Sequence, residues 1–272
     1  MPRKWYKWSF LLLLTLTNCT VKDSFTFFPD RVSEIPMNEI PSFAEEHIIS
    51  TADAESIQSF YFHHQTGEQL PLLIYFHGNA GNLYSRFEPA TRIYQLGYDV
   101  LLVSYRGYAK STGTPTEKGI FLDGEAAVNY AISKLDYQEE NIALLGRSLG
   151  STVAVHIAQY RNFQGVLLIT PLTSGRDMAV AMGLGMLKFL AGNSYNSMEK
   201  INHLTSPLLI IHGDRDEVVP YHMGKSLFEA YNGPKHMVTI KNGRHNDLTD
   251  VDPVQYWGEI ERFLAGQIGG TP

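Results

Sequence analysis

Short runs of hydrophobic residues recur along the chain, and helix-length stretches separate most of them. Runs of four or five hydrophobic residues suit strands that are buried on both faces of a sheet. Two further segments carry the β-branched and aromatic residues that are typical of strands. We therefore predict strands at residues 57–63, 72–76, 100–103, 142–145, 165–169, 208–211 and 236–240.

The stretches between these runs have the length and spacing of helices. We predict helices at about residues 83–96 and 117–135, from Ser148 onward, and at about 221–231 and 252–264. Strands that alternate with helices of about 10 to 15 residues favour an α/β fold, in which helices cover both faces of a mostly parallel sheet. Catalytic groups in such folds lie at the carboxyl ends of the strands, so a site is expected in those loops.

The N-terminus has the pattern of a sorting signal. Arg3, Lys4 and Lys7 precede a hydrophobic run over residues 8–16. A transmembrane helix needs roughly 20 hydrophobic residues, so this run is too short to span a bilayer. A basic segment followed by a short hydrophobic segment is instead typical of a secretory signal.

The hydrophobic run ends near Cys19, which is the only cysteine of the chain. Residues 16–19 read Leu-Thr-Asn-Cys and resemble a bacterial lipoprotein box, in which the cysteine becomes the lipidated first residue of the mature protein. Asn18 stands where that box usually has a small residue. The resemblance implies a lipoprotein that is anchored to the membrane of the cell envelope and faces away from the cytoplasm. An ordinary signal peptide, a signal anchor or a cytoplasmic terminus are the alternatives.

The length of 272 residues suits one large domain preceded by accessory segments. We expect a signal at residues 1–19, followed by a lead-in segment at 20–50 that contains three prolines and little periodicity. The main α/β domain then covers residues 51–266, with an insertion at about 172–201, and a tail at 267–272 closes the chain.

Composition excludes several classes of protein. Hydrophobic residues make up 44% of the chain and charged residues 18%, values that exclude intrinsic disorder, collagen and coiled coils. The net charge of −6 and the lack of a basic block beyond the N-terminus argue against nucleic acid as a partner. A single cysteine excludes an internal disulfide framework and a cysteine-rich metal site.

The strongest motif lies between a predicted strand and a predicted helix. Residues 146–150 read Gly-Arg-Ser-Leu-Gly, which is the pattern G-x-S-x-G. A serine on such a sharp turn is held in a strained conformation, and the flanking glycines allow other backbone to approach closely. The helix N-terminus behind it favours developing negative charge. Ser148 is therefore a candidate nucleophile, although a tight turn without chemistry can produce the same short pattern.

A nucleophilic serine needs a base, and the base needs a carboxylate that orients it. Of the ten histidines, His245 lies in a polar loop between the last predicted strand and the last helix, where the base of such a site is expected. His156 lies within the helix after Ser148 and is expected to be packed, and His212 ends a strand and is expected to be structural.

The orienting carboxylate is expected after the strand at 208–211. Asp214, Asp216 and Glu217 all follow that strand and compete for the role. We select Asp216, while the alternative is that all three only solvate the loop.

The oxyanion hole should combine the backbone N–H of Leu149 with an N–H from an earlier loop. Residues 77–82 read His-Gly-Asn-Ala-Gly-Asn after a predicted strand, which makes the N–H of Asn79 the candidate second donor. A phosphate-binding loop is the competing interpretation, but its pattern G-x-x-x-x-G-K-[ST] is absent. The sequence also shows no H-E-x-x-H or other metal spacing, so no metal or cofactor is predicted.

Together these segments resemble the alpha/beta-hydrolase superfamily, and in particular the alpha/beta-hydrolase-domain (ABHD) proteins that include protein and lipid deacylases. The resemblance runs from about residue 28 to 264. It implies an alpha/beta-hydrolase fold with Ser148 as nucleophile, Asp216 as orienting acid and His245 as base. Ala109 and Ala54 stand at turn positions where the family usually has glycine. The matching segments are 28–29, 77–82, 105–108, 146–150, 212–213, 216–220 and 245–247.

The insertion at residues 172–201 should carry the specificity. It is rich in methionine and other hydrophobic residues, which suit irregular or adaptable hydrophobic surfaces. We weigh a cap that accepts an acyl chain against an ordinary helix packed on the core. The hydrophobic residues concerned are Met178, Val180, Met182, Leu184, Met186, Leu187, Phe189 and Leu190.

The predicted function is therefore that of a serine hydrolase, with an acyl-enzyme intermediate and without a cofactor. Carboxylic esters and thioesters are the expected substrates, as small-molecule or lipid-like acyl compounds or an acylated protein. A serine peptidase of the same fold, a cytoplasmic hydrolase of small esters and a non-catalytic envelope protein that binds a lipid or a partner are the alternatives.

Overall fold

The computed structural model describes residues 26–31, 39–65, 67–185 and 191–267. The predicted signal with Cys19 lies outside these residues, as do most of the predicted tail and residues 186–190 of the predicted cap. Within the described ranges, no helix combines the length and hydrophobicity that a bilayer crossing requires.

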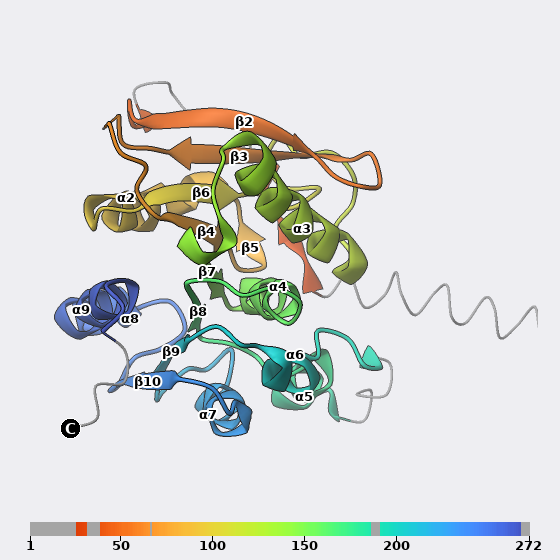
Figure 1. Ribbon diagram of the computed structural model, residues 1–272. Coiled ribbons are helices and arrows are strands. Elements are labelled where there is room, and N and C mark those ends of the chain that lie inside the picture. Colours follow the sequence, from red (N-terminus) through yellow and green to blue (C-terminus); the bar gives the residue numbers. More distant parts are fainter. Residues whose placement is uncertain (1–25, 32–38, 66, 186–190, 268–272) are drawn as a thin grey trace, which may run out of the picture.

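Eight strands form one sheet in the order β10-β9-β8-β7-β4-β6-β3-β2 (Figure 1). All neighbours pair in parallel except the edge strands, where β3 is antiparallel to both β2 and β6. The predicted mostly parallel alpha/beta-hydrolase sheet is confirmed. The strands are β2 (Ala44–Ser50), β3 (Ser56–Phe62), β4 (Leu72–Phe76), β6 (Asp99–Val103), β7 (Ile142–Arg147), β8 (Gly165–Ile169), β9 (Leu208–Gly213) and β10 (Lys235–Ile240).

Helices cover both faces of this sheet (Figure 1). Helices α3, α4 and α7 share one hydrophobic core with alternate strand residues such as Ile74, whereas α2 and α9 share a second core with residues such as Leu73. This division follows from the alternation of side chains along a strand. The helices are α2 (Phe87–Gln95), α3 (Glu117–Lys134), α4 (Leu149–Ala158), α5 (Gly175–Ala181), α6 (Ser197–Lys200), α7 (Tyr221–Ala230), α8 (Leu248–Val251) and α9 (Pro253–Leu264).

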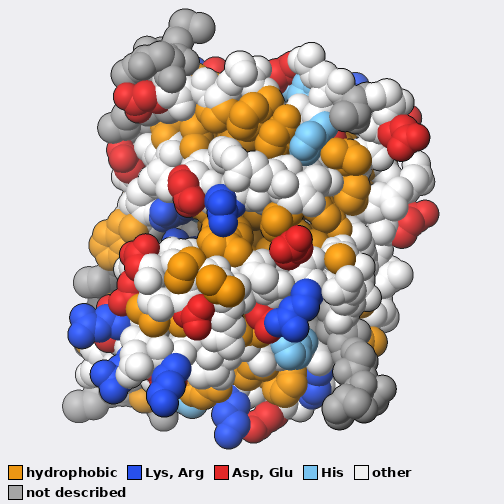
Figure 2. Space-filling view, turned by 90° about the vertical axis from the view of Figure 1, so that its left-hand side faces the viewer, with side chains coloured by type: hydrophobic (Ala, Val, Ile, Leu, Met, Phe, Trp, Pro, Cys, Tyr) orange, Lys and Arg blue, Asp and Glu red, His pale blue; other side chains and the backbone are white. Residues whose placement is uncertain are grey.

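The surface beside α2, α8 and α9 is mixed in character. Figure 2 shows this side, with hydrophobic side chains lying between acidic and basic ones. Val251 and Val254 are among its exposed hydrophobic residues. Interspersed groups of this kind are normal on the outer surface of helices that bury their other face.

One short strand pair lies outside the main sheet, and the main sheet itself begins earlier in the sequence than expected. A two-stranded parallel pair joins β1 (Phe28–Pro29) to β5 (Ala80–Gly81). Strand β2 lies in the predicted lead-in segment, so the main sheet begins at Ala44 rather than after residue 50. Only Ile49 of β2 is fully buried, because an edge strand has one neighbour and needs no continuous hydrophobic run.

In the described part of the insertion, at residues 172–185 and 191–201, neither α5 nor α6 is fully buried in the core. Helix α5 has no buried residue, although Met178 packs against the core from a half-buried position. Val180, Met182 and Leu184 are exposed. The insertion therefore presents hydrophobic side chains at the surface.

Candidate active site

Ser148 lies on the sharp turn between β7 and α4. Its backbone has φ 52° and ψ −119°, a conformation that residues other than glycine rarely adopt. Hydrogen bonds hold the turn, because Ser148 N–H donates to the Ile169 carbonyl at 2.8 Å and Ser151 N–H donates back to the Ser148 carbonyl at 2.9 Å. Strain of this kind persists only where the surroundings enforce it, and it is frequent at functional sites.

The two glycines of the motif permit this packing. A Cβ atom on Gly150 would lie 2.1 Å from the Phe76 carbonyl oxygen, and one on Gly146 would lie 2.5 Å from the Gly150 carbonyl oxygen. The start of α4 can therefore lie directly against the end of β4. As a result Gly78, in the loop after β4, lies beside Ser148, and a Cβ there would be 3.5 Å from the serine Cβ.

His77 fixes the peptide group that contains the Asn79 N–H. Its ring is fully buried, and Nδ1 lies 2.6 Å from the Gly78 carbonyl oxygen. Because a carbonyl only accepts, Nδ1 is the donor in this bond. Burial lowers the pKa of His77 to about 3, against the opposing effect of that hydrogen bond, so the ring is neutral at pH 7.

Two tyrosines hold the carbonyls on either side of Gly78. The Tyr105 hydroxyl donates to the His77 carbonyl at 3.0 Å, and the Tyr108 hydroxyl donates to the Asn79 carbonyl at 2.6 Å. Burial raises the pKa of both tyrosines, so each remains a donor at pH 7. Successive peptide groups of this loop are thus fixed by buried side chains.

Strand β1 holds the same loop from outside the main sheet. The Phe28 N–H donates to the Asn79 carbonyl at 3.1 Å, and the Asn79 side-chain amide donates to the Thr26 carbonyl at 3.0 Å. Asp30 N–H donates to the Gly81 carbonyl at 3.2 Å. Residues 26–30 of the lead-in segment therefore pack against the loop that lies beside Ser148.

The predicted oxyanion donors are both available. Within the described ranges, neither the Leu149 N–H nor the Asn79 N–H donates a hydrogen bond to another protein group. The Leu149 N–H is free because it lies in the first turn of α4. Preorganised N–H groups without partners in the resting protein are what an oxyanion hole requires.

The structure brings Asp216 and His245 together. Asp216 Oδ2 accepts a hydrogen bond from His245 Nδ1 at 2.8 Å, and both residues are buried. Asp216 Oδ1 accepts from the N–H groups of Val218 and Val219, at 2.9 and 2.7 Å. The competing carboxylates are exposed: Asp214 bonds to the backbone of the next loop instead, and Glu217 points into solvent.

The pKa of Asp216 reflects two opposing effects. Burial alone would raise the pKa of this carboxyl, but hydrogen bonds from His212, His245 and the Val219 N–H outweigh burial and hold it well below its usual range. The carboxylate is therefore ionised at neutral pH and can orient His245.

Arg147 links the loop that contains His245 to the turn that contains Ser148. Its guanidinium donates to the His245 carbonyl at 3.1 Å and to the Asn246 side chain at 3.0 Å. Ser148 and His245 do not share a hydrogen bond in the described structure, and such bonds are often long before a substrate binds. Sequence reasoning did not assign a role to Arg147, which is the variable second position of the motif.

His212 lies against the same carboxylate. It is fully buried, and its Nε2 lies 2.9 Å from the Val219 carbonyl oxygen and 3.3 Å from Asp216 Oδ2. The sequence predicted only a structural role at the end of a strand. The structure adds direct contact with the candidate acid.

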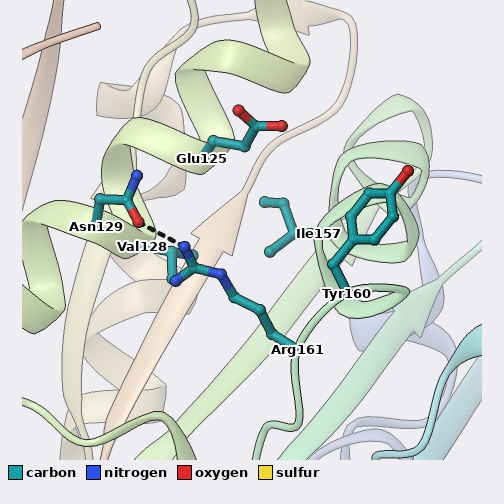
Figure 3. A pocket seen from close by; sticks show the side chains of 6 residues that line it. All are labelled: Glu125, Val128, Asn129, Ile157, Tyr160 and Arg161. Atoms are coloured by element: carbon teal, nitrogen blue, oxygen red, sulfur yellow. Dashed lines mark hydrogen bonds between the residues drawn. The ribbon is translucent and has the colours of Figure 1, made fainter. Parts of the chain in front are cut away.

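His156 and a surface pocket between α3 and α4 lie away from the candidate site. The His156 ring stacks on Phe121 with centroids 4.0 Å apart, in line with the expected packing role. A pocket of about 200 Å³ between α3 and α4 is lined by Glu125, Val128, Asn129, Ile157, Tyr160 and Arg161 (Figure 3). It contains no predicted site residue and lies at the opposite end of α4 from Ser148. In the part of the chain that the structure describes, no group of three or more His, Cys, Asp or Glu side chains is arranged to hold a metal ion.

Comparison with known proteins identifies the family. A sequence family described as the alpha/beta hydrolase fold matches residues 71–193. Over 198 residues the chain is 31% identical to alpha/beta hydrolase domain-containing protein 17B of Homo sapiens, covering 72% of this chain and 67% of that protein. The chain belongs to the alpha/beta-hydrolase superfamily. The predicted superfamily is thereby confirmed, and this membership supports hydrolase activity.

Further relatives agree with this assignment. The alpha/beta hydrolase described here is 32% identical over 240 residues to an uncharacterized protein of Mycobacterium tuberculosis, covering 88% of this chain and 85% of that relative. It is similar to the solved structure of an esterase from Pyrococcus furiosus, with a TM-score of 0.71 and 20% identity over 88% of this chain and 98% of that chain. At that identity the likeness shows the shared fold.

Proposed function

We propose that this alpha/beta hydrolase is a serine hydrolase that cleaves carboxylic esters or thioesters of acyl substrates. The observation that carries the proposal is the buried Asp216–His245 pair, held beside the strained Ser148 turn with two unengaged backbone N–H groups nearby. A buried, ionised carboxylate bonded to a histidine is the pairing that activates a serine nucleophile.

The mechanism follows from the positions of these groups. His245 takes the proton of the Ser148 hydroxyl as its oxygen attacks the substrate carbonyl. The N–H groups of Leu149 and Asn79 bind the oxyanion of the tetrahedral intermediate. His245 then protonates the leaving group, and a water molecule activated by the same ring hydrolyses the acyl-enzyme. Asp216 keeps the Nδ1–H tautomer of His245, so that Nε2 is free to accept the proton.

The substrate class rests on the hydrophobic insertion. Strand β8, after which the insertion begins, lies between β7 and β9, which carry the candidate nucleophile and acid. The insertion therefore leaves the sheet between the two halves of the site, and it presents Val180, Met182 and Leu184 at the surface. These side chains suit an acyl chain, as in a lipid-like ester or an acylated protein, better than a polar peptide.

Fluorophosphonate labelling tests the nucleophile directly. We expect the wild-type protein to be labelled and Ser148→Ala to be unlabelled, because the probe reacts with an activated serine. Ser133→Ala, which removes an exposed serine from α3, serves as the matched control and should label normally. A folded wild-type protein that does not react would contradict the proposal and favour the non-catalytic binding role.

A panel of p-nitrophenyl esters with increasing acyl length then measures which acyl-chain length the candidate site hydrolyses best. We expect hydrolysis that depends on Ser148 and a chain-length optimum longer than acetate, because the insertion offers hydrophobic contact. Labelling without turnover of esters or matched thioesters, together with cleavage of peptide substrates, would favour a serine peptidase.

A further inference from the structure

His212 is a buried, titratable side chain that the mechanism above does not use. It lies on β9, four residues before Asp216, and its ring has no exposed surface. Its Nε2 faces two acceptors, the Val219 carbonyl oxygen at 2.9 Å and Asp216 Oδ2 at 3.3 Å. Asp216 Oδ2 is the oxygen that also receives the His245 Nδ1–H, at 2.8 Å.

The surroundings determine which nitrogen of His212 carries the proton. A carbonyl and an ionised carboxylate only accept hydrogen bonds, so Nε2 must be protonated. Nδ1 has no hydrogen-bond partner and faces Gly224 of α7, where a Cβ would lie only 2.3 Å away. A second proton at Nδ1 would be buried without an acceptor, which is costly. The ring is therefore a neutral donor with a fixed orientation.

We propose that His212 is a positioning residue that acts through Asp216, holding Oδ2 in the geometry that orients His245 and sharing its negative charge. The proposal rests on the proposed function. With Oδ1 held by two backbone N–H groups and Oδ2 held by two histidines, rotation of the carboxylate would break contacts on both oxygens.

The geometry also predicts how His212 affects the basicity of His245. A donor on Oδ2 reduces the charge that this oxygen offers to the protonated His245 ring. Without His212, the carboxylate would interact more strongly with the protonated His245 ring. Among the described residues, charged or titratable groups that contact this cluster include Tyr221, whose ring edge packs on His212 with centroids 5.7 Å apart, and Arg147, which binds the His245 carbonyl.

Substitution of His212 separates this role from a merely structural one. His212→Leu keeps a buried side chain but removes the donor, whereas His212→Gln can place an N–H near the position of Nε2. For His212→Leu we expect kcat for a p-nitrophenyl ester to fall about tenfold, the effect of losing one hydrogen bond to a charged group, with little change in KM. The acid limb of the kcat/KM profile should shift to higher pH by about half a unit to one unit. His212→Gln should recover most of both losses.

Two further variants provide a control and a second test of the same contact. His222→Gln changes an exposed histidine at the start of α7 and should leave the rate and the pH profile unchanged. Gly224→Ala pushes on the His212 ring without changing the ring itself, and should reproduce the shift of the acid limb if His212→Leu fails to fold.

The outcomes distinguish this inference from the proposed function. Loss of kcat with a shifted acid limb and rescue by glutamine supports the role of His212. If the wild type is active and the pH profiles of His212→Leu and Gly224→Ala both equal its own, the role of His212 is overturned and the proposed function stands. A folded wild type that neither labels nor turns over overturns both.

Discussion

His77 and Asp216 are both buried, and burial favours the neutral form of each. For His77 no ionic partner opposes this effect, and its pKa falls to about 3. For Asp216, hydrogen bonds from two histidines and from backbone N–H groups reverse the effect and keep the carboxylate charged. The neutral His77 ring can orient the loop at residues 77–82, while the charged Asp216 carboxylate can orient His245.

The state of His77 predicts how stability depends on pH. The unfolded chain binds a proton on this ring below about pH 6.5, whereas the folded protein excludes it until about pH 3. The contribution of His77 is therefore fully present above pH 6.5 and is lost as the pH falls. Between pH 7 and pH 5, we expect the free energy of unfolding to drop by about 2 kcal/mol more in the wild type than in His77→Gln.

Urea unfolding at the two pH values measures this difference. His222→Gln is the control, because an exposed histidine with little change of environment should leave the pH dependence of the wild type intact. Equal pH dependence in His77→Gln and the wild type would show that the ring can be protonated within the fold.

At this scale, the sequence predicted the residues that follow a spacing rule. Ser148 lies in a five-residue motif, and Asp216 and His245 follow predicted strands in the expected order. Arg147 and the contact of His212 with the acid could not be predicted. Their partners are 98 residues and four residues away in the sequence, and only the packing of β9, α7 and the base loop creates these contacts.

Among the elements, a buried arginine joins three parts of the structure, namely the segment after β6, the β2–β3 turn and helix α3. Arg106 binds Asp123 of α3 at 2.8 Å and Asp53 of the β2–β3 turn at 2.7 Å. In the sequence it lies between Tyr105 and Tyr108, whose hydroxyl groups bind the carbonyls of His77 and Asn79. Burial raises the pKa of Asp123 while its hydrogen bonds with Arg106 oppose that rise. The ion pair thus fixes α3 against the segment that supports the site.

Loss of the two partners of Arg106 should lower the free energy of unfolding by different amounts. Asp123 is fully buried, so Asp123→Asn leaves a buried guanidinium without its inner partner and should reduce the free energy of unfolding by about 3 kcal/mol or more. Asp53 has 41% of its side chain exposed, and Asp53→Asn should cost less than about 1 kcal/mol. Chemical denaturation of both variants tests the ranking, and similar losses would contradict it.

The elements that could be predicted are those with a strong local pattern. Strands β4 and β8 begin and end at the predicted residues, because five consecutive buried positions leave little ambiguity. The pair β1–β5 could not be predicted, since each member has two residues and is stabilised by a partner about fifty positions away. Strand β2 was missed because its consecutive polar residues, Glu45, Glu46 and His47, resemble a loop.

At the scale of the whole molecule, the strand order assembles the site. The candidate residues follow β4, β7, β9 and β10, and β4 is next to β7 as β9 is next to β10. The alternation of strands and helices predicted the parallel sheet and the edge at which the loops meet. It could not predict the order of the strands, which depends on how the helices pack across the two faces.

The predicted lipid anchor at Cys19 would determine where the whole molecule is located. We expect a metabolic palmitate label on the protein when it is expressed in a bacterium, and loss of both the label and the membrane fraction in Cys19→Ala. Ser24→Ala, a nearby change that leaves the cysteine intact, should keep the label. Recovery of the protein in the cytoplasm with its first twenty or so residues intact would contradict an envelope location.

Because β1 pairs with β5, only a short length of chain would separate a lipidated Cys19 from the folded domain. Thr26, whose carbonyl binds the Asn79 side chain, follows Cys19 by only seven positions. Even a fully extended chain of that length reaches no more than about 25 Å. A lipidated Cys19 would therefore keep Thr26, and the loop at residues 77–82 that it contacts, close to the bilayer surface. A hydrolase held there would meet substrates in the lipid far more often than those dissolved away from it.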